Sequence, residues 1–365
     1  MRIAVVAPSS ELPGGQALLA SLHVAALRGD GHQVTFLPIN PAPPARLQWM
    51  TARAGLRTLA TEASYLPSLS KLSHVDAVHV FSAAYWSFLI APAPAMLAAR
   101  ALRRRVVLNY HSGEAPDHLG RWGWRVHPFL MLADEIVVTS RYLGAVFGAH
   151  GYPTRVIPGI VDLSQFAYRE RGPGARVLSV RNLLPMYDID TIVNAFARVR
   201  AARPDATLTI AGAGPEGPAL HALVDSLGLA SAVRFLGWVP ARDMPRLVAE
   251  SDVMLNASVI DNQPGSILEA FAAGLPVVTT PTGGIAELVR DRRTGLTVPA
   301  NRPDAMAAAA LWLLDHPDAR RAMTREAREV IRDFTWTAVR DAWMDVYAPA
   351  SPASPARVPG LSRTA

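Results

Sequence analysis

The chain has no cysteine and almost no lysine. Because none of its 365 residues is cysteine, disulfide bonds and thiolate metal sites are excluded, and the composition is compatible with a reducing compartment. Lys71 is the single lysine, so 35 of the 36 basic residues are arginine. These arginines are scattered, and no basic stretch interleaved with aromatic residues stands out, so the net charge of +6 is weak evidence for a nucleic-acid partner. We expect a cytoplasmic protein that does not bind nucleic acid.

One uncharged stretch, residues 80–99, has the length of a membrane span. Pro92 and Pro94 interrupt it, and it follows a strand-like segment, DAVHV. We therefore predict a buried helix there and not a transmembrane segment. Arg2 followed by IAVVAP is too short for a signal peptide and reads as the first strand.

Short apolar strands alternate with helical patterns along the first half of the chain. The predicted strands span residues 2–8, 32–38, 76–81, 105–110, 135–140 and 155–159, and the predicted helices include residues 16–30 and 141–148. Such alternation predicts a parallel sheet covered by helices on both faces. A polar stretch rich in Arg, Gly and Pro at residues 168–175 then marks a domain linker.

A second series of strands and helices follows this linker. Its strands span residues 175–180, 206–212, 232–237 and 252–258, and its helices span residues 190–202 and 219–227, with a short helix near Met244. Because 365 residues exceed one ordinary core, we predict an α/β protein of two Rossmann-like domains facing across a cleft. The N-terminal domain would span residues 1–168 and the C-terminal domain residues 175–335, followed by an amphipathic helix and a disordered tail at 349–365.

Residues 261–269, DNQPGSILE, carry the most informative pattern. Asp261 lies in a Pro/Gly loop, and Glu269 lies on the first turns of the helix that begins near Ser266. Backbone N–H groups at the start of that helix would attract an anion, and two carboxylates could accept hydrogen bonds from sugar hydroxyls. Open α/β sheets bind ligands beyond their strand ends. The pattern suits a sugar joined to a diphosphate, although Ser266-x-x-Glu269 is also a capping box.

These residues resemble the donor-site signature of retaining glycosyltransferases of the GT-B fold, in the family 4 group. That signature has two glutamates separated by seven residues, an Ala-x-x-x-Gly-x-Pro-Val-Val stretch and a Gly-Gly pair. The matching residues are Glu269, Ala270, Gly274, Pro276, Val277, Val278, Gly283 and Gly284.

The resemblance extends over nearly the whole chain, to about residue 347, and carries several implications. It implies that the helix at residues 336–348 returns to the N-terminal domain. It also implies a retaining, hexosyltransferase-type enzyme without a cofactor. Such an enzyme moves a sugar from a nucleoside diphosphate sugar to a glycan or lipid-linked acceptor, as in polysaccharide biosynthesis.

Arg181 and two glycines are candidates for contact with the diphosphate. Arg181 follows a predicted strand, where its guanidinium could form a bidentate pair with the diphosphate and stabilise charge on the leaving group. Gly14 and Gly15 follow the first strand, where glycines let the backbone approach a phosphate without a Cβ clash. The resemblance implies that this loop closes over the diphosphate. A surface arginine and an ordinary tight turn are the alternatives.

The resemblance assigns further roles around the donor. Glu269 would hold the ribose hydroxyls and Asp261 the sugar, while His111 would lie beside the reacting centre. His111, Asp261 and Arg181 are therefore the expected catalytic residues. The other expected substrate contacts are Tyr187, Gly214, Val239, Pro264, Gly265, Ser266 and Ile267. Glu114 and Asp117 are candidates for acceptor binding or for a general base.

Two positions depart from the family pattern. Tyr187 stands where the family has a lysine, so one of two cations on the leaving group would be missing. Asp261 replaces the first glutamate and is one methylene shorter. These departures leave open a nucleotide-sugar-binding protein without transfer activity. A nucleotide-sugar epimerase on the same two-lobed fold is a further alternative.

Two other segments carry alternative interpretations. Asp188 and Asp190 form a literal Asp-x-Asp, a metal motif in the other major glycosyltransferase fold, but they precede a predicted helix and favour capping. We therefore predict no catalytic metal. Residues 46–72 are apolar with spaced arginines, and with Trp49 and Tyr65 they could dock on anionic lipid at the inner face of the membrane. A solvated helix face is the alternative to this peripheral membrane contact.

Overall fold

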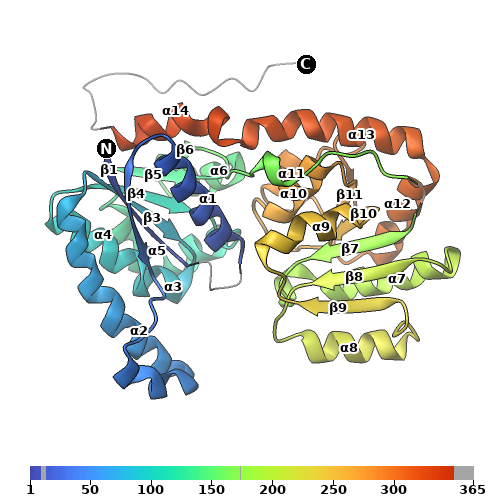
Figure 1. Cartoon of the computed structure of the whole chain (residues 1–365), viewed down its shortest axis with the longest axis horizontal. Helices are drawn as coiled ribbons and strands as arrows, with labels where there is room; N and C mark the ends of the chain where they lie inside the picture. The colour runs from blue at the N-terminus through green and yellow to red at the C-terminus, as the bar shows by residue number, and fades with distance from the viewer. Residues whose placement is uncertain (10–13, 173, 349–365) are drawn as a thin grey trace.

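The computed structural model describes residues 1–9, 14–172 and 174–348, arranged as two lobes side by side (Figure 1). The segment 349–365, predicted as a disordered tail, lies outside the described residues. Each lobe contains a six-stranded sheet whose strand pairs are all parallel. The prediction of an α/β protein with two Rossmann-like domains is therefore confirmed.

The first sheet has the strand order β2-β1-β3-β4-β5-β6. Its strands are nearly continuous apolar runs because helices cover both faces, and all six residues of β3 are buried. The strands are β1 (Arg2–Ala7), β2 (Gln33–Pro38), β3 (Ala77–Ser82), β4 (Arg105–Tyr110), β5 (Glu135–Val138) and β6 (Arg155–Val156). The helices are α1 (Gly15–Gly29), α2 (Ala54–Ser68), α3 (Tyr85–Ile90), α4 (Pro92–Ala101), α5 (Ala115–Leu130) and α6 (Arg141–Ala149).

The second sheet has the order β12-β11-β10-β7-β8-β9. Its strands are β7 (Arg176–Val180), β8 (Thr207–Ala211), β9 (Val233–Gly237), β10 (Val253–Asn256), β11 (Val277–Thr279) and β12 (Leu296–Thr297). The helices are α7 (Ile189–Ala202), α8 (Gly217–Ser226), α9 (Met244–Ala249), α10 (Gly265–Ala273), α11 (Ile285–Leu288), α12 (Pro303–Asp315) and α13 (Pro317–Val330). Short 3-10 turns include η1 (Ala45–Ala52), η2 (Leu69–His74), η4 (Pro185–Tyr187) and η6 (Ile331–Phe334).

The last helix, α14 (Trp336–Tyr347), packs against the first sheet after the chain has left the second. Figure 1 shows α13 and α14 running along one side of both lobes. Trp343 stacks on His79 of β3 with ring centroids 4.7 Å apart, and the Tyr347 hydroxyl lies 2.6 Å from His79 Nδ1. The C-terminal helix therefore contributes to the core of the N-terminal lobe.

The predicted single buried helix at residues 80–99 is wrong in its form. This stretch contains the end of β3 followed by two helices, α3 and α4, because Pro92 begins a new helix. Proline is well suited to a first helical turn, where its missing N–H costs no hydrogen bond. Among the described residues, no helix is long and apolar enough to cross a bilayer.

In each sheet the direction of strand addition reverses at one point. In the second sheet this switch point lies between β7 and β10, because β8 and β9 extend one edge while β11 and β12 extend the other. Loops beyond the carboxyl ends of strands at a switch point are the usual ligand site of open α/β sheets. The loops after β7 and β10 carry Arg181 and Asp261.

Candidate active site

Arg181 is fixed at the switch point of the second sheet. Its Nε donates a hydrogen bond to Asn256 Oδ1 at 3.0 Å, and Nη2 pairs with the carboxylate of Asp261. The guanidinium also lies over the ring of Tyr187, with Cζ 4.9 Å from the ring centroid. Arg181 and Asp261 are mostly buried, their side chains being 13% and 12% exposed. Arg181 and Asp261 therefore form an ion pair, although the sequence assigned Arg181 to the diphosphate of the donor and Asp261 to its sugar.

Tyr187 contacts Arg181 through its aromatic ring. Tyr187 stands where the family has a lysine, and in the structure its aromatic face supports the guanidinium by a cation–π contact. Burial raises the pKa of the Tyr187 hydroxyl. The positive charge of Arg181 opposes this rise, and the negative charges of Asp261 and of Glu114, on the loop after β4, add to it.

Glu269 is a buried carboxyl group near Arg181. It lies on α10 and is 7% exposed. Burial raises its pKa to about 7, and the positive charge of Arg181 partly opposes this rise. The capping box with Ser266 does not form, because Pro264 occupies the N-cap of α10 and no side chain caps this helix.

The start of α10 offers fewer groups to a ligand than the sequence suggested. Ile267 is fully buried in the core, and its N–H already donates to the Pro264 carbonyl at 3.1 Å. Gly265 has open space where a Cβ would lie, and Ser266 is 9% exposed. The N–H groups of Gly265 and Ser266 belong to the first helical turn, which has no intrahelical acceptor for them.

The loop at Asp261 touches the N-terminal lobe. A Cβ placed on Gly113, in the loop after β4, would lie 2.6 Å from the Asp261 carbonyl carbon. Gly283 has φ +53°, and a Cβ there would collide with the Asp261 carbonyl oxygen. Two glycines from different lobes thus give the Asp261 backbone the room it occupies.

His111 lies on the N-terminal side of this contact, directly after β4. Its ring stacks on Phe81 with centroids 5.1 Å apart and an interplanar angle of 2°. Burial lowers its pKa to about 3, so the imidazole is neutral near pH 7. Its Nε2 atom is buried and has no hydrogen-bond partner. Gly113, two residues further on, meets Asp261, so the structure brings the His111 loop and the Arg181 cluster together.

Polar side chains beside Asp261 join the lobes. Ser140 Oγ donates to Asn262 Oδ1 at 2.5 Å, and Asn262 Nδ2 donates to Thr139 Oγ1 at 2.6 Å. Gln263 Oε1 accepts from the Gly159 N–H at 2.7 Å. Because Asn262 is 2% exposed, these bonds lie inside the interface and fix the Asp261 loop against β5.

Glu287 forms a second bridge between the lobes. From α11 its carboxylate accepts hydrogen bonds from the N–H groups of Arg141 and Tyr142, at 3.0 and 2.5 Å. These N–H groups lie in the first turn of α6, which has no intrahelical acceptors and favours negative charge. A carboxylate of the C-terminal lobe thus occupies the start of a helix in the N-terminal lobe.

Gly14, Gly15, Gly214 and Val239, the remaining predicted contacts, have different local surroundings. Gly14 has φ +153°, and neither Gly14 nor Gly15 would place a Cβ within 4 Å of another atom. Gly214 is required by its own domain, because a Cβ there would collide with the Leu183 carbonyl. Val239 is partly buried and packs on the core beside α10.

Asp188 occupies the N-cap position of α7 with φ 48°. Burial and a hydrogen bond with Asp190 raise its pKa to about 7. Among the described residues no group of three or more histidine, aspartate or glutamate side chains could hold a metal ion. The expectation that catalysis needs no metal stays a prediction.

Comparison with known proteins assigns both lobes. The family model described as "Glycosyltransferase Family 4" matches residues 13–165, and "Glycosyl transferases group 1" matches residues 174–316. The chain belongs to the glycosyltransferases of the GT-B fold. The "Glycogen synthase" of Mycobacterium tuberculosis is 28% identical over 353 residues, which cover 92% of this chain and 82% of that protein.

Another relative and two solved structures extend this comparison. A GDP-mannose-dependent alpha-(1-6)-phosphatidylinositol monomannoside mannosyltransferase of Mycolicibacterium smegmatis is 32% identical over 62% of this chain and 65% of that protein. Anabaena HepE in complex with UDP-glucose has a TM-score of 0.75 at 19% identity, over 94% and 98% of the two chains. Sucrose-phosphate synthase from Thermosynechococcus elongatus has a TM-score of 0.77 at 20% identity, over 95% and 98%. At these identities the solved structures inform the fold alone.

Sequence reasoning about this glycosyltransferase missed three residues of the site. Asn256 holds Arg181, while Asn262 and Glu287 connect the lobes. A signal existed for the first two, since each is a polar residue at or just beyond the end of the buried strand β10. Glu287 is an exposed residue of the four-residue helix α11, and nothing in its local sequence indicates a partner 145 residues away.

Proposed function

We propose that this GT-B glycosyltransferase moves a hexosyl unit from a nucleoside diphosphate sugar to a glycan or lipid-linked acceptor with retention at the anomeric carbon. The observation that supports it best is the cluster of Arg181, Asp261 and Glu269 at the β7–β10 switch point. The His111 loop meets this cluster from the other lobe. A cation, two carboxyl groups and free helical N–H groups match the chemistry of a sugar diphosphate.

Donor binding would exchange the partners of Arg181. A diphosphate carries more negative charge than the Asp261 carboxylate and can accept two parallel N–H bonds from a guanidinium. Asp261, released from Arg181, would accept a hydrogen bond from a hydroxyl of the transferred sugar. The pair of Arg181 and Asp261 therefore keeps both groups ordered until the donor replaces it.

Glu269 and His111 would hold the two ends of the donor. The Glu269 carboxylate would accept hydrogen bonds from the ribose hydroxyls, which favour its charged form. The neutral His111 imidazole would contact the transferred sugar beside the reacting carbon. Attack from the same face as the leaving group, with the donor phosphate taking the acceptor proton, would give retention without a carboxylate nucleophile.

A second candidate function is a nucleotide-sugar-binding protein without transfer activity. The pairing of Asp261 with Arg181 favours it, because the shorter carboxylate already has a strong partner. Such a protein would be stabilised by nucleotide sugars but would not turn them over.

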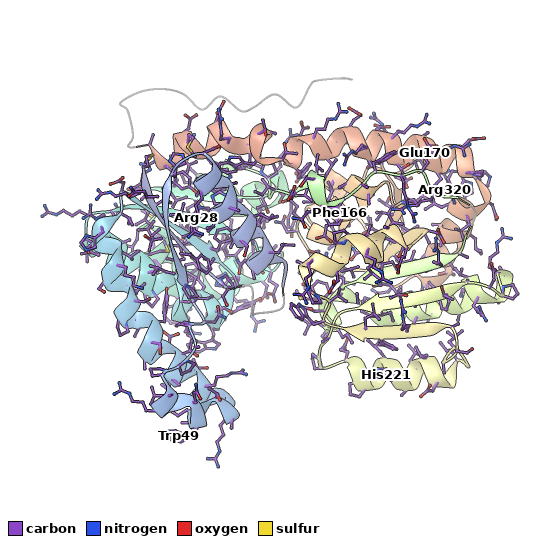
Figure 2. All side chains as sticks on the ribbon, in the orientation of Figure 1. Arg28, Trp49, Phe166, Glu170, His221 and Arg320 are labelled. Atoms are coloured by element: carbon purple, nitrogen blue, oxygen red, sulfur yellow. The ribbon has the colours of Figure 1, made fainter. Side chains whose placement is uncertain are left out.

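Contact with an anionic membrane remains part of the proposal for a lipid-linked acceptor. Trp49 is 70% exposed and Leu59 on α2 is 62% exposed, while Arg53 and Arg57 lie between them in the sequence. Figure 2 places Trp49 at the outer end of the segment that projects from the N-terminal lobe. Tyr65 does not belong to this surface, since it is fully buried and donates to the Ala91 carbonyl at 2.7 Å.

Donor hydrolysis tests the proposed function. The purified chain would be incubated with UDP-, GDP-, ADP- and dTDP-linked hexoses, and ¹H NMR would follow the released sugar. We expect slow hydrolysis of one donor, first releasing the anomer that the donor carries. Glu269→Gln should reduce the rate roughly 10- to 100-fold, because it removes hydrogen bonds to a charged group. Glu250→Gln, on the surface of the same lobe, is the matched control. Release of the opposite anomer would contradict retention.

A further inference from the structure

A chain of buried polar side chains connects α14 to the strand that carries His111. Asn109 Nδ2 lies 3.0 Å from His79 Nε2, His79 Nδ1 lies 2.6 Å from Tyr347 Oη, and the same hydroxyl lies 2.6 Å from His23 Nε2. Burial keeps His23 and His79 neutral by lowering the pKa of each imidazole. All four side chains are 3% exposed or less.

The direction of every hydrogen bond in this chain follows from its first member. The Asn109 amide nitrogen can only donate, so His79 accepts at Nε2 and carries its single proton on Nδ1. His79 then donates to Tyr347, and the tyrosine hydroxyl donates to His23. This order leaves the Asn109 carbonyl oxygen, Oδ1, facing away from the chain, and the structure gives it no partner.

A small cavity lies where this chain meets His111. Its volume is about 10 Å³, and its walls include Asn109, His111, Thr139 and the apolar side chains of Phe81 and Trp343. Two of the lining residues each carry a buried polar atom without a partner, Asn109 Oδ1 and His111 Nε2. A space of this size is close to the minimum for one water molecule, which needs two or more polar partners.

We propose that one water molecule occupies this cavity and joins Asn109 Oδ1 to His111 Nε2, which makes Asn109 a positioning residue for His111. The proposal rests on the proposed function, in which His111 contacts the transferred sugar. A buried polar atom without a partner loses its hydrogen bond to water and gains nothing in return, so a water that bridges both atoms has a clear physical reason.

The bridge also selects the tautomer of His111. Asn109 Oδ1 accepts one hydrogen of the water, and the second hydrogen needs an acceptor because unpaired buried donors are rarer than unpaired acceptors. In the proposed bridge His111 Nε2, which has no other partner, accepts this hydrogen, and the imidazole therefore carries its proton on Nδ1. The other edge of the ring then presents an N–H donor, which suits a hydroxyl oxygen of a sugar.

Thr139 extends the bridge toward the second lobe. Its hydroxyl oxygen accepts a hydrogen bond from Asn262 Nδ2 at 2.6 Å, and Thr139 also lines the cavity. The Thr139 proton can therefore be donated to the water. Asn262 follows Asp261 in the sequence. With the water in place, each group from Asn262 through Thr139, the water, Asn109 and His79 to Tyr347 donates a hydrogen bond to the next one.

Long-range ¹H–¹⁵N spectra of the imidazoles test the tautomer in the ligand-free protein. We expect His111 of the unmodified chain at pH 7 to be neutral with its proton on Nδ1, and Asn109→Leu to give a mixture of both tautomers. Tyr347→Phe is a milder variant. It removes the hydrogen-bond partner of His79 Nδ1, so the His79 ring no longer fixes the orientation of the Asn109 amide. Its matched control is Tyr65→Phe, which removes another buried hydroxyl of the same lobe and should leave the His111 signals unchanged.

Kinetics supply the second readout. For donor hydrolysis, Asn109→Leu should lower kcat roughly 10- to 100-fold, as expected for a misplaced contact near the reacting atoms, with little change in KM. Asn109→Asp places a carboxylate beside His111 and should move the acid limb of the pH profile to higher pH. The other titratable groups that face His111 are His23 of α1 and His79 of β3, both neutral, with Tyr347 of α14 beyond them.

Two results would overturn the proposal. One is a His111 of the unmodified chain with its proton on Nε2, and the other is a tautomer that Asn109→Leu and Tyr347→Phe leave unchanged. The spectra need no substrate, so they decide the bridge even if every donor proves inert. Inert donors combined with the expected spectra would sink the proposed function and leave the water bridge standing.

Discussion

At the scale of single residues, Glu269 combines a cost in stability with the role in donor binding that we propose. Its carboxyl is 7% exposed, and burial raises its pKa to about 7. A carboxylate in that position is costly to ionise without a ligand, whereas ribose hydroxyls would supply the missing hydrogen bonds. Strongly perturbed groups of this kind cluster at functional sites.

Glu269→Gln should therefore stabilise the ligand-free protein at high pH. The folded pKa of Glu269 lies above its unfolded value of 4.5, so the folded chain binds this proton more tightly. Its contribution to stability is fully present below pH 4.5, declines as the pH rises toward 7, and stays lost above. Glutamine carries no charge at any pH, so we expect a gain of up to about 3 kcal/mol at pH 8 and almost none near pH 4. Urea unfolding at both pH values measures this, and equal stabilities at pH 8 would contradict it.

Arg181→Lys should weaken donor binding and leave the fold intact. Lysine lacks the planar fork that reaches Asn256 and Asp261 from two different nitrogens, and it cannot lie flat over Tyr187. We expect the dissociation constant of the hydrolysed donor to rise roughly tenfold or more. Titration calorimetry measures this constant. Arg176→Lys is the control, because Arg176 pairs with Asp252 at the opposite end of β7. An unchanged affinity in Arg181→Lys would remove Arg181 from the donor site.

At the scale of elements, the sequence predicted those strands and helices that local residue patterns determine. Apolar runs located β1, β4 and β7, and amphipathic periodicity located α14. The break between α3 and α4 was missed because Pro92 was taken as an interruption within one helix. Arg181 and Glu269 could be located from their motifs. Their contacts could not, because the Arg181–Asp261 pair spans 80 residues and depends on the order of β7 and β10 in the sheet.

Gly274 ends α10 and determines how this helix meets the linker. It lies at the C-cap with φ 70°, and a Cβ there would lie 2.7 Å from the Arg169 carbonyl oxygen and from Tyr168. Gly274→Ala should destabilise the protein by about 1–3 kcal/mol, as thermal unfolding would show. Gly29→Ala, where a Cβ meets nothing within 4 Å, is the control and should change stability by less than about 1 kcal/mol. Equal effects of both substitutions would refute the strain at Gly274.

At the scale of the whole molecule, the two lobes meet through polar contacts that a few residues carry. Asn262 joins Thr139 and Ser140, while Glu287 accepts from the first N–H groups of α6. An interface built from hydrogen bonds can open at low cost, because water replaces each partner. In the proposed function the reacting groups come from both lobes, so the separation of the lobes should control their alignment.

Glu287→Ala should shift the ligand-free protein toward a more open form. It removes both acceptors from the Arg141 and Tyr142 N–H groups without touching either core. We expect a larger radius of gyration in small-angle X-ray scattering, with a melting temperature close to that of the unmodified chain. Glu326→Ala, which breaks an ion pair with Arg293 inside the C-terminal lobe, should leave the scattering unchanged. Identical curves for Glu287→Ala and the unmodified chain would show that this bridge does not hold the lobes.

The most direct test of a donor site at Arg181, Asp261 and Glu269 is thermal melting with a panel of UDP-, GDP-, ADP- and dTDP-sugars. A ligand that binds only the folded state raises the melting temperature by mass action. We expect one nucleotide class to raise the melting temperature of the unmodified chain and of Glu250→Gln, and to raise that of Glu269→Gln far less. No rise with any nucleotide sugar, or an equal rise in Glu269→Gln, would contradict a donor site at these residues.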